Sequence, residues 1–290
     1  MRARRDAWAR GAVAVAAIAI VAAPAAAQSA TRAPASQATA ASPAPGRRTV
    51  VVDAGHGGRD NGMSGSVAGM GRIYEKDITL QVAQRVGTRL QLAGVNVIMT
   101  RSSDTLIALS DRGRIANREG GELFMSIHVN AANPNWREPG AARGFETYFL
   151  AEAKTEDERR VAAMENEAAR FDDASDIPRD DALGFMFADM RQNEHLRESS
   201  DLAATIQASM RSAHPGPNRG VKQAGFRVLV TAFMPSVLIE IGFGTNRSEA
   251  AWLVSANGQA RIADAITRAA LDYLARYEKR VAGGSPGPGK

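Results

Sequence analysis

Three side chains that could bind a metal ion lie where strands and a helix are expected to begin or end. His56 follows a predicted apolar strand at residues 49–53, and His128 lies near the end of a second predicted strand at residues 123–129. Glu75 opens the first predicted helix, after a glycine-rich loop. Two imidazoles and one carboxylate are a known ligand set of catalytic zinc, which keeps a fourth position for water. These residues are candidate ligands of one Zn²⁺, although a histidine near a strand end is more commonly hydrogen-bonded or exposed.

Glu240 is a candidate general base, because it interrupts the apolar strand predicted at residues 236–241. A buried carboxylate is unfavourable unless it is paired or lines a site, and burial raises its pKa toward the range in which a base works at neutral pH. The alternative is an edge strand on which Glu240 faces solvent.

Other side chains with comparable chemistry are few. The 290-residue chain has no cysteine, so a packed core or a metal must supply any tight stabilisation. Two of its four histidines, His195 and His214, are expected to be surface residues.

The elements that must position these residues alternate between strand and helix. Strands are expected at residues 49–53, 95–99, 123–129, 145–150, 226–230 and 236–241. Helices are expected at residues 75–92, 110–117 (capped by Ser110), 155–171, 181–210 and about 262–277. Apolar strands without alternation are covered on both faces, which indicates an α/β, three-layer domain with a mostly parallel or mixed central sheet. Ligands of such sheets bind at the carboxyl ends of the strands, where the candidate zinc site falls.

The ends of the chain are expected to lie outside this domain. Residues 1–27 have a basic start, an apolar run and a small-residue cleavage pattern, which are typical of a signal peptide. We therefore expect a periplasmic protein with no stable membrane anchor after processing near Ala27; an uncleaved anchor is the alternative, and Arg4-Arg5 leaves twin-arginine export open. Residues 28–46 indicate a flexible linker, residues 47–282 the folded domain and residues 283–290 a disordered tail.

The net charge gives little support to a nucleic-acid partner. The formal charge is +5 for the whole chain and +2 once residues 1–27 are removed. No recognisable nucleic-acid-binding module is present, so no such partner is expected.

Four segments together resemble one family of enzymes. VVVDAGHGGRDNG (residues 50–62), YEKDITL (74–80), SIHVNA (126–131) and MPSVLIEIGFGTN (234–246) are similar to motifs of the zinc-dependent N-acetylmuramoyl-L-alanine amidases, the cell-separation or type 3 amidases. The resemblance covers about residues 48–275. It implies hydrolysis of the amide bond between N-acetylmuramic acid and L-alanine of the peptidoglycan stem peptide, in wall remodelling and daughter-cell separation.

The resemblance also implies a role for each matched residue. His56, Glu75 and His128 would be the zinc ligands, and Glu240 the catalytic glutamate. Three further residues fall in family-like contexts but could equally be structural: Asn130, Arg101 and Arg112.

Residues 152–201 depart from a minimal α/β plan. They carry 15 acidic and seven basic residues, a net charge of −8, and include a capping box from Thr155 to Glu158. A solvated helical hairpin is one interpretation. The other, suggested by the resemblance, is a lid from which Glu165 or Glu167 occupies the open zinc position until an activator protein displaces it.

Two other functions stay open at this stage. A different zinc peptidase acting on cell-wall peptides could use the same ligands, and a non-catalytic wall-binding domain would need none of them. The activator, the muropeptide preference and the oligomeric state are not determined by the sequence.

Overall fold

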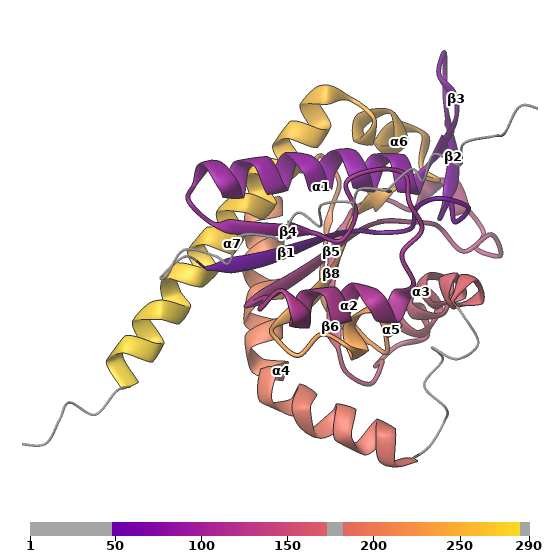
Figure 1. Ribbon diagram of the computed structural model, residues 1–290. Helices are drawn as coiled ribbons and strands as arrows, with labels where there is room; N and C mark the ends of the chain where they lie inside the picture. The colour runs from indigo at the N-terminus through magenta and orange to yellow at the C-terminus, as the bar shows by residue number, and fades with distance from the viewer. Residues whose placement is uncertain (1–47, 173–181, 285–290) are drawn as a thin grey trace, which may run out of the picture. The chain divides into compact units, whose positions relative to one another are not determined.

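The computed structural model describes residues 48–172 and 182–284, with side chains at 48–172 and 195–280 (Figure 1). The predicted signal peptide and linker lie outside the described residues, as does the centre of the acidic segment. Helix α7 continues through Gly284, two residues into the predicted tail. Within the described residues, no helix combines the length and the hydrophobicity needed to cross a bilayer.

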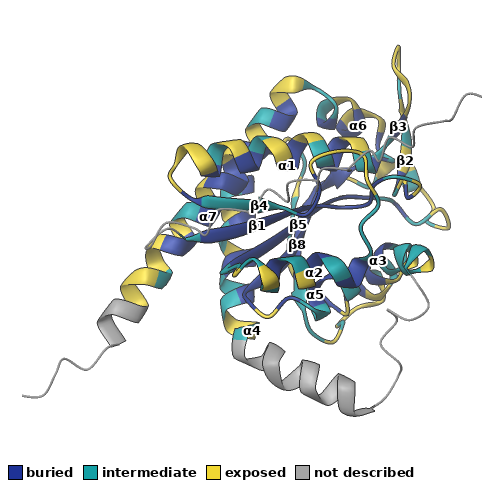
Figure 2. Cartoon of the chain, in the orientation of Figure 1, coloured by how far each residue is buried: buried dark blue, intermediate teal, exposed yellow. Residues whose placement is uncertain are grey.

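A mixed sheet of six strands forms the centre of the fold, as expected from the sequence. The strand order is β4-β1-β5-β8-β6-β7, in which only the β6–β8 pair is antiparallel. The strands are β1 (Thr49–Ala54), β4 (Asn96–Met99), β5 (Leu123–Asn130), β6 (Phe145–Leu150), β7 (Asn218–Ala224) and β8 (Ser236–Phe243). Every residue of β1, β5 and β8 is buried, because helices cover both faces of the sheet (Figure 2).

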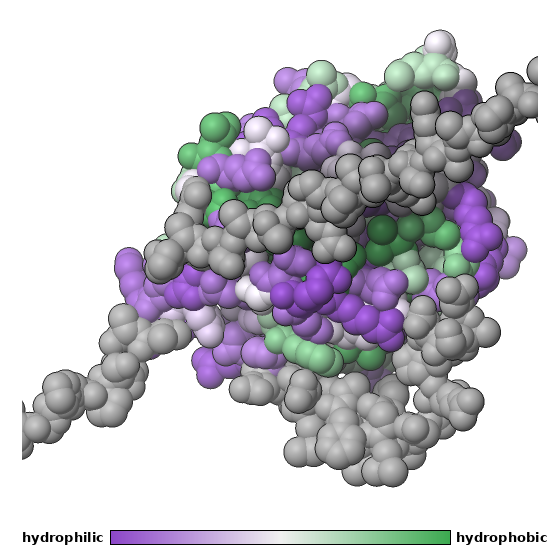
Figure 3. Space-filling model, viewed as in Figure 1, coloured by the Kyte–Doolittle hydropathy of each residue, from purple (hydrophilic) through white to green (hydrophobic). Residues whose placement is uncertain are grey.

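Helices divide between the two faces of the sheet. One core cluster joins the sheet to α1 (Glu75–Leu92), α4 (Ala182–Met210), α6 (Arg247–Leu253) and α7 (Ala256–Gly284). The other cluster joins it to α2 (Leu109–Arg118), α3 (Glu156–Asn166) and α5 (Arg227–Val230). Hydrophilic side chains predominate on the outer faces of α1 and α2 (Figure 3), although Leu92 at the end of α1 is exposed.

Several predicted elements differ from the observed ones. The strand predicted at residues 226–230 is wrong: its apolar residues form the short helix α5, which buries Val228 and Leu229, whereas the strand β7 is polar and lies at the sheet edge. The helix predicted at 155–171 ends as α at Asn166 and continues as a 3₁₀ helix, Glu167–Phe171.

Two smaller differences concern local structure. Helix α2 begins at Leu109 with Ala108 as its N-cap, so Ser110 does not cap it. The glycine-rich loop contains a hairpin of β2 (Ser64–Val67) and β3 (Gly71–Tyr74), which lacks the apolar alternation of a half-buried strand.

His214 is buried, so the prediction that it is a surface residue is wrong, whereas His195 is half-buried. The His214 ring contacts Phe145 and Trp252, and its Nδ1 accepts a hydrogen bond from the Gly216 amide at 2.8 Å. Burial lowers the pKa of this imidazole to about 4.

This burial predicts an acid-dependent loss of stability. Between pH 6.5, the ordinary histidine pKa, and the folded pKa of about 4, only the unfolded chain binds the extra proton. His214 is therefore expected to lower the free energy of unfolding by about 2 kcal/mol between pH 8 and pH 5. His214→Asn keeps an acceptor for the Gly216 amide and cannot titrate, so urea unfolding at the two pH values should show a smaller decrease. Equal decreases in both proteins would contradict the prediction.

Candidate active site

The loop after β1 holds His56 in an unusual backbone conformation. His56 has a φ of +61°, the left-handed region that non-glycine residues rarely adopt. Arg112 fixes it from below, since Nη2 donates to the His56 carbonyl at 2.9 Å and Nη1 donates to Asp53 Oδ1 at 2.9 Å. Arg101 Nη2 donates to the Gly55 carbonyl at 2.8 Å. Both arginines are buried and position the loop, which is the structural alternative that the sequence left open.

Glu75 is held at the first residue of α1 by two backbone amides. Oε2 accepts from the Met63 amide at 2.8 Å, and Oε1 accepts from the Val129 amide at 2.8 Å. The same carboxylate therefore ties the glycine-rich loop and strand β5 to the start of the helix. Its side chain is fully buried, and contacts with two imidazoles hold the pKa of Glu75 below its ordinary value in spite of burial.

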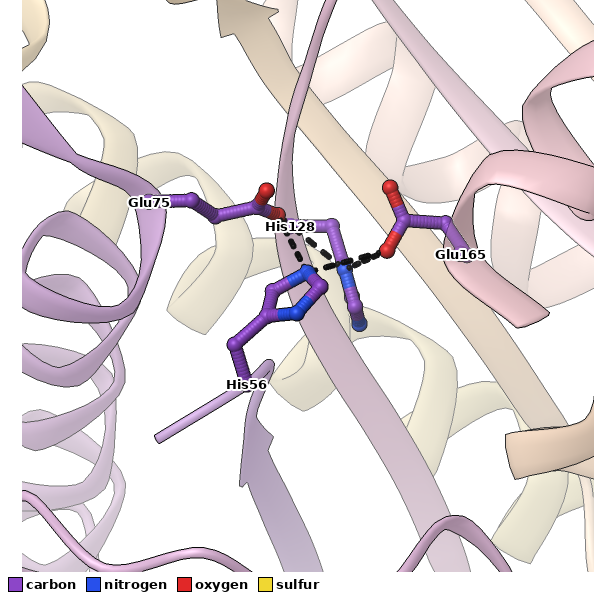
Figure 4. A group of neighbouring side chains, drawn as sticks. All are labelled: His56, Glu75, His128 and Glu165. Atoms are coloured by element: carbon purple, nitrogen blue, oxygen red, sulfur yellow. Dashed lines mark hydrogen bonds and ion pairs between the residues drawn. The ribbon is translucent and has the colours of Figure 1, made fainter. Parts of the chain in front are cut away.

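Strand β5 completes the cluster by placing His128 against Glu75 and His56. His56 Nε2 lies 3.2 Å and His128 Nδ1 3.1 Å from Glu75 Oε1. One ligand atom from each of these residues and from Glu165 lies within 4.8 Å of all the others (Figure 4). Tetrahedral zinc with bonds of about 2.0 Å separates its ligands by about 3.3 Å, so the spacing fits this ion.

Glu165 is the fourth member, and the structure decides between the two acidic residues that the sequence left open. Its Oε2 lies 3.0 Å from His56 Nε2 and 2.7 Å from His128 Nδ1. Glu165 comes from α3 and is buried, whereas Glu167 is exposed on the following turn. Burial disfavours a charged imidazole, but Glu165 and Glu75 together raise the pKa of His128 to about 9. The cluster thus attracts positive charge.

Two further residues orient the imidazoles, and neither was predicted as a site residue. Asp60 Oδ2 lies 2.8 Å from His56 Nδ1, which leaves Nε2 to face the cluster. Ser126 Oγ lies 3.1 Å from His128 Nε2 and donates to Asp53 Oδ2 at 2.5 Å, which leaves His128 Nδ1 to face the cluster. Partners of this kind fix the ring and its tautomer in metal sites. Sequence spacing could have suggested both, because Asp60 shares the loop of His56 and Ser126 shares the strand face of His128.

Glu240 lies on the neighbouring strand, outside the four-residue cluster. It is paired in register with His128 of β5 and with Glu146 of β6. It is fully buried, and neither carboxylate oxygen has a hydrogen-bond partner among the described residues. Burial, followed by the charges of nearby glutamates, raises the pKa of Glu240 well above its ordinary value. The edge-strand alternative is therefore wrong.

Asn130 has a defined role at the same edge. Its Nδ2 donates to Glu146 Oε1 at 2.7 Å, which links β5 to β6 across β8. No hydrogen bond is described between Asn130 and either imidazole. Its amide instead orients the carboxylate of Glu146, which is paired in register with Glu240.

Helix α3 begins at a capping box and packs on the core through its apolar side. The predicted capping box is present, with the Glu158 amide donating to Thr155 Oγ1 and the Thr155 amide donating to Glu158 Oε2. Val161 and Ala162 pack into the core beneath it. The acidic segment at residues 152–201 is therefore not wholly a solvated hairpin, because its first helix places the buried Glu165 carboxylate in the cluster.

The fold and the cluster define an α/β protein with a candidate metal centre at the carboxyl ends of its strands. The profile of the Amidase_3 family, described as N-acetylmuramoyl-L-alanine amidase, matches residues 50–272. The chain belongs to this family, and its enzyme class is N-acetylmuramoyl-L-alanine amidase, a peptidoglycan hydrolase. The family resemblance stated from the four motifs is confirmed.

Individual relatives support the assignment over most of the chain. N-acetylmuramoyl-L-alanine amidase AmiA of Escherichia coli is 32% identical over 245 residues, 83% of this chain and 81% of that protein. The solved amidase AmiC2 of Nostoc punctiforme has a TM-score of 0.58 at 29% identity and covers 80% of this chain and 99% of its own. CwlD of Clostridioides difficile, solved in complex with the GerS lipoprotein, has a TM-score of 0.56 at 25% identity and covers 79% of this chain and 100% of its own.

Proposed function

We propose that this amidase is zinc-dependent and that His56, Glu75 and His128 hold the ion, with Glu240 as the catalytic base. The observation that supports this most directly is the convergence of the three ligand atoms close to Glu240, a buried carboxylate with no hydrogen-bond partner in the described part of the chain. When bound, zinc would lower the pKa of a water molecule and polarise the scissile carbonyl.

Glu240 would move the protons of the reaction. Its carboxylate takes a proton from the attacking water and then gives it to the leaving nitrogen of L-alanine. Burial, and after it the negative charge of Glu165, raises the pKa of Glu240 and disfavours its charged form while α3 is closed. Departure of Glu165 would lower this pKa and favour the ionised carboxylate, which is the form that can accept a proton.

The products distinguish this function from the alternatives. An amidase leaves the lactyl carboxylate on the muramic acid and a free amine on L-alanine, whereas a cell-wall peptidase cleaves within the peptide. The test is digestion of purified sacculi by the processed protein, with and without a chelator, read by mass spectrometry. Peptides cleaved internally would overturn the assignment, and a wall-binding domain without catalysis would release nothing.

The orientation of His56 by Asp60 gives a prediction for the metal site. Asp60→Ala is expected to weaken zinc affinity by about 10- to 100-fold, because the His56 ring loses its only described partner on Nδ1. Competition with a zinc chelator measures this change. Asp104→Ala is the matched control, since Asp104 binds the Gly58 amide of the same loop but is not described in contact with either imidazole. Equal losses in both variants would indicate a general disruption of the loop.

We further propose that α3 is a lid that keeps the enzyme inactive. Glu165 would take the place that water and substrate need, since its carboxylate lies on His56 and on His128 near the carboxyl end of β5. An activator protein would displace the segment at 152–201. The complex of the neighbour CwlD with a lipoprotein supports the idea that partners act on this fold.

The cellular setting is proposed from the sequence. The signal-peptide pattern predicts that the processed protein is periplasmic, with peptidoglycan as its substrate and wall remodelling and daughter-cell separation as its expected roles. Microscopy of a strain that lacks this gene and any other amidase genes tests this setting, with the gene added back as the comparison. Chains of unseparated cells that the added gene resolves would support it, and chains that persist would contradict it.

A further inference from the structure

Two basic residues of β7, Arg219 and Lys222, lie near the candidate active site and share acidic partners. Strand β7 neighbours β6, which neighbours β8, so the pair is two strands from Glu240. Both cations contact the buried Glu146, with Arg219 Nε at 2.7 Å and Lys222 Nζ at 2.6 Å from its Oε2. Arg219 and Lys222 together carry two positive charges and Glu146 one negative charge, so one positive charge on the sheet is left for another partner.

Asp157 of α3 is the anion that faces this pair in the structure, and it also pairs with Arg160 of the same helix, whose Nη2 lies 3.0 Å from its Oδ1. Its Oδ2 lies 3.3 Å from Arg219 Nη2 and 3.3 Å from Lys222 Nζ, longer than the contacts to Glu146. The side chains of Asp157 and Arg219 are 26% and 27% exposed, so solvent reaches this contact, unlike the Glu146 carboxylate, which is 0% exposed. Asp157 is therefore the partner of the basic pair that another anion could replace.

The same helix thus covers two places with carboxylates. Glu165 lies on the imidazoles and Asp157, eight residues earlier, on the basic pair. At 1.5 Å per residue these positions are about 12 Å apart along the helix. An extended peptide advances about 3.3 to 3.6 Å per residue, so the same span corresponds to about three residues.

We infer that Arg219 and Lys222 bind a free carboxylate on the second or third residue of the stem peptide, and that Asp157 holds this place while α3 is closed. The inference rests on the proposed function, because it puts the scissile amide at the imidazole cluster. Glu146 is buried against both cations and belongs to the sheet, so it stays with the pair when the helix moves and the remaining positive charge becomes available to a substrate. A stem peptide whose carboxylate is amidated lacks the matching charge and would bind less tightly.

The test compares synthetic muramoyl tripeptides that differ only in one carboxyl group. One substrate carries free carboxylates at the second and third residues, and two others carry a carboxamide at one of these positions. The zinc-loaded protein is used with Glu165→Gln in every sample, so that the Glu165 contact with the imidazoles is weakened equally throughout. We expect KM to be about tenfold higher for one carboxamide substrate, with kcat little changed.

Lys222→Met is expected to abolish this preference by raising KM for the free-acid substrate about tenfold. Arg219 is then the one cation left to pair with both Glu146 and the substrate carboxylate. Lys154→Met removes the same charge from an exposed site and is the matched control. Asp157→Asn removes the internal competitor without changing the basic pair, so it should lower KM for the free acid several-fold and lower KM for the carboxamides by less. Equal KM values for all substrates in the Glu165→Gln protein would overturn the inference. So would an equal rise in KM for the free acid with Lys154→Met.

A binding measurement separates this inference from the proposed function. If no substrate is hydrolysed, the proposed function fails, but titration calorimetry with the free tripeptide still tests the basic pair. Binding that depends on Lys222 and on the free carboxylate would support the inference. Binding that is absent, or that is indifferent to both, would overturn it.

Discussion

Glu165→Gln is expected to raise the unactivated release of stem peptides from purified sacculi by about 10- to 100-fold. The Glu165 carboxylate contacts both imidazoles at 3.0 and 2.7 Å, and all three side chains are buried. Hydrogen bonds to charged groups contribute about 1.5 to 3 kcal/mol, which corresponds to this range of the population shift from closed to open. A neutral amide keeps the size of the side chain and loses the charge, so the closed state becomes less favourable.

Glu167→Gln is the matched control for this prediction. Glu167 lies two residues later in the same segment and is exposed, so the same loss of charge should leave the basal rate unchanged. Deletion of the whole segment is a less specific test, because Val161 and Ala162 of α3 are part of the core. An unchanged or lower rate in a folded Glu165→Gln protein would contradict the lid proposal.

Glu240→Gln is expected to lower kcat by about 10²- to 10⁴-fold while zinc stays bound. The amide cannot accept a proton, yet it nearly matches the carboxyl in volume, so the packing between β5 and β6 should be retained. Elemental analysis measures the zinc content, and mass spectrometry of released peptides measures turnover. The effect should be seen in the Glu165→Gln background, in which the lid does not limit the rate.

A ligand variant separates loss of the base from loss of the metal. His56→Ala is expected to lose both zinc and turnover, whereas Glu240→Gln should lose turnover alone. Release of stem peptides at a near-normal rate by Glu240→Gln would exclude Glu240 as the base. Loss of zinc in this variant would instead place Glu240 among the groups that hold the metal.

Much of the fold was predictable because its core strands and helices carry local patterns. The apolar runs of β1, β5 and β8 and the four-residue spacing in α1 are strong features that burial on two faces or on one face requires. Strand β7 was missed because NRGVKQA at a sheet edge has no apolar run, and α5 was misassigned because a short apolar stretch fits either a strand or a buried turn.

The candidate site was predictable in its residue types and in part of its arrangement. His56, Glu75 and His128 follow or open elements whose ends meet at one edge of a parallel sheet, so their proximity follows from topology. His214 shows the limit of such reasoning, because its burial against Phe145 and Trp252 depends on contacts between residues far apart in the chain.

The sequence by itself determined the α/β class, the family and the residues that carry its motifs, because these depend on local pattern and on side-chain chemistry. Only the tertiary structure decided that Glu165 rather than Glu167 reaches the imidazoles, that Arg101 and Arg112 brace the His56 loop, and that Asp157 lies on a basic pair. Acidic residues two positions apart on a helix have the same charge and similar reach. Which of them is buried depends on the face that α3 packs against the sheet, and that packing is a property of the whole fold.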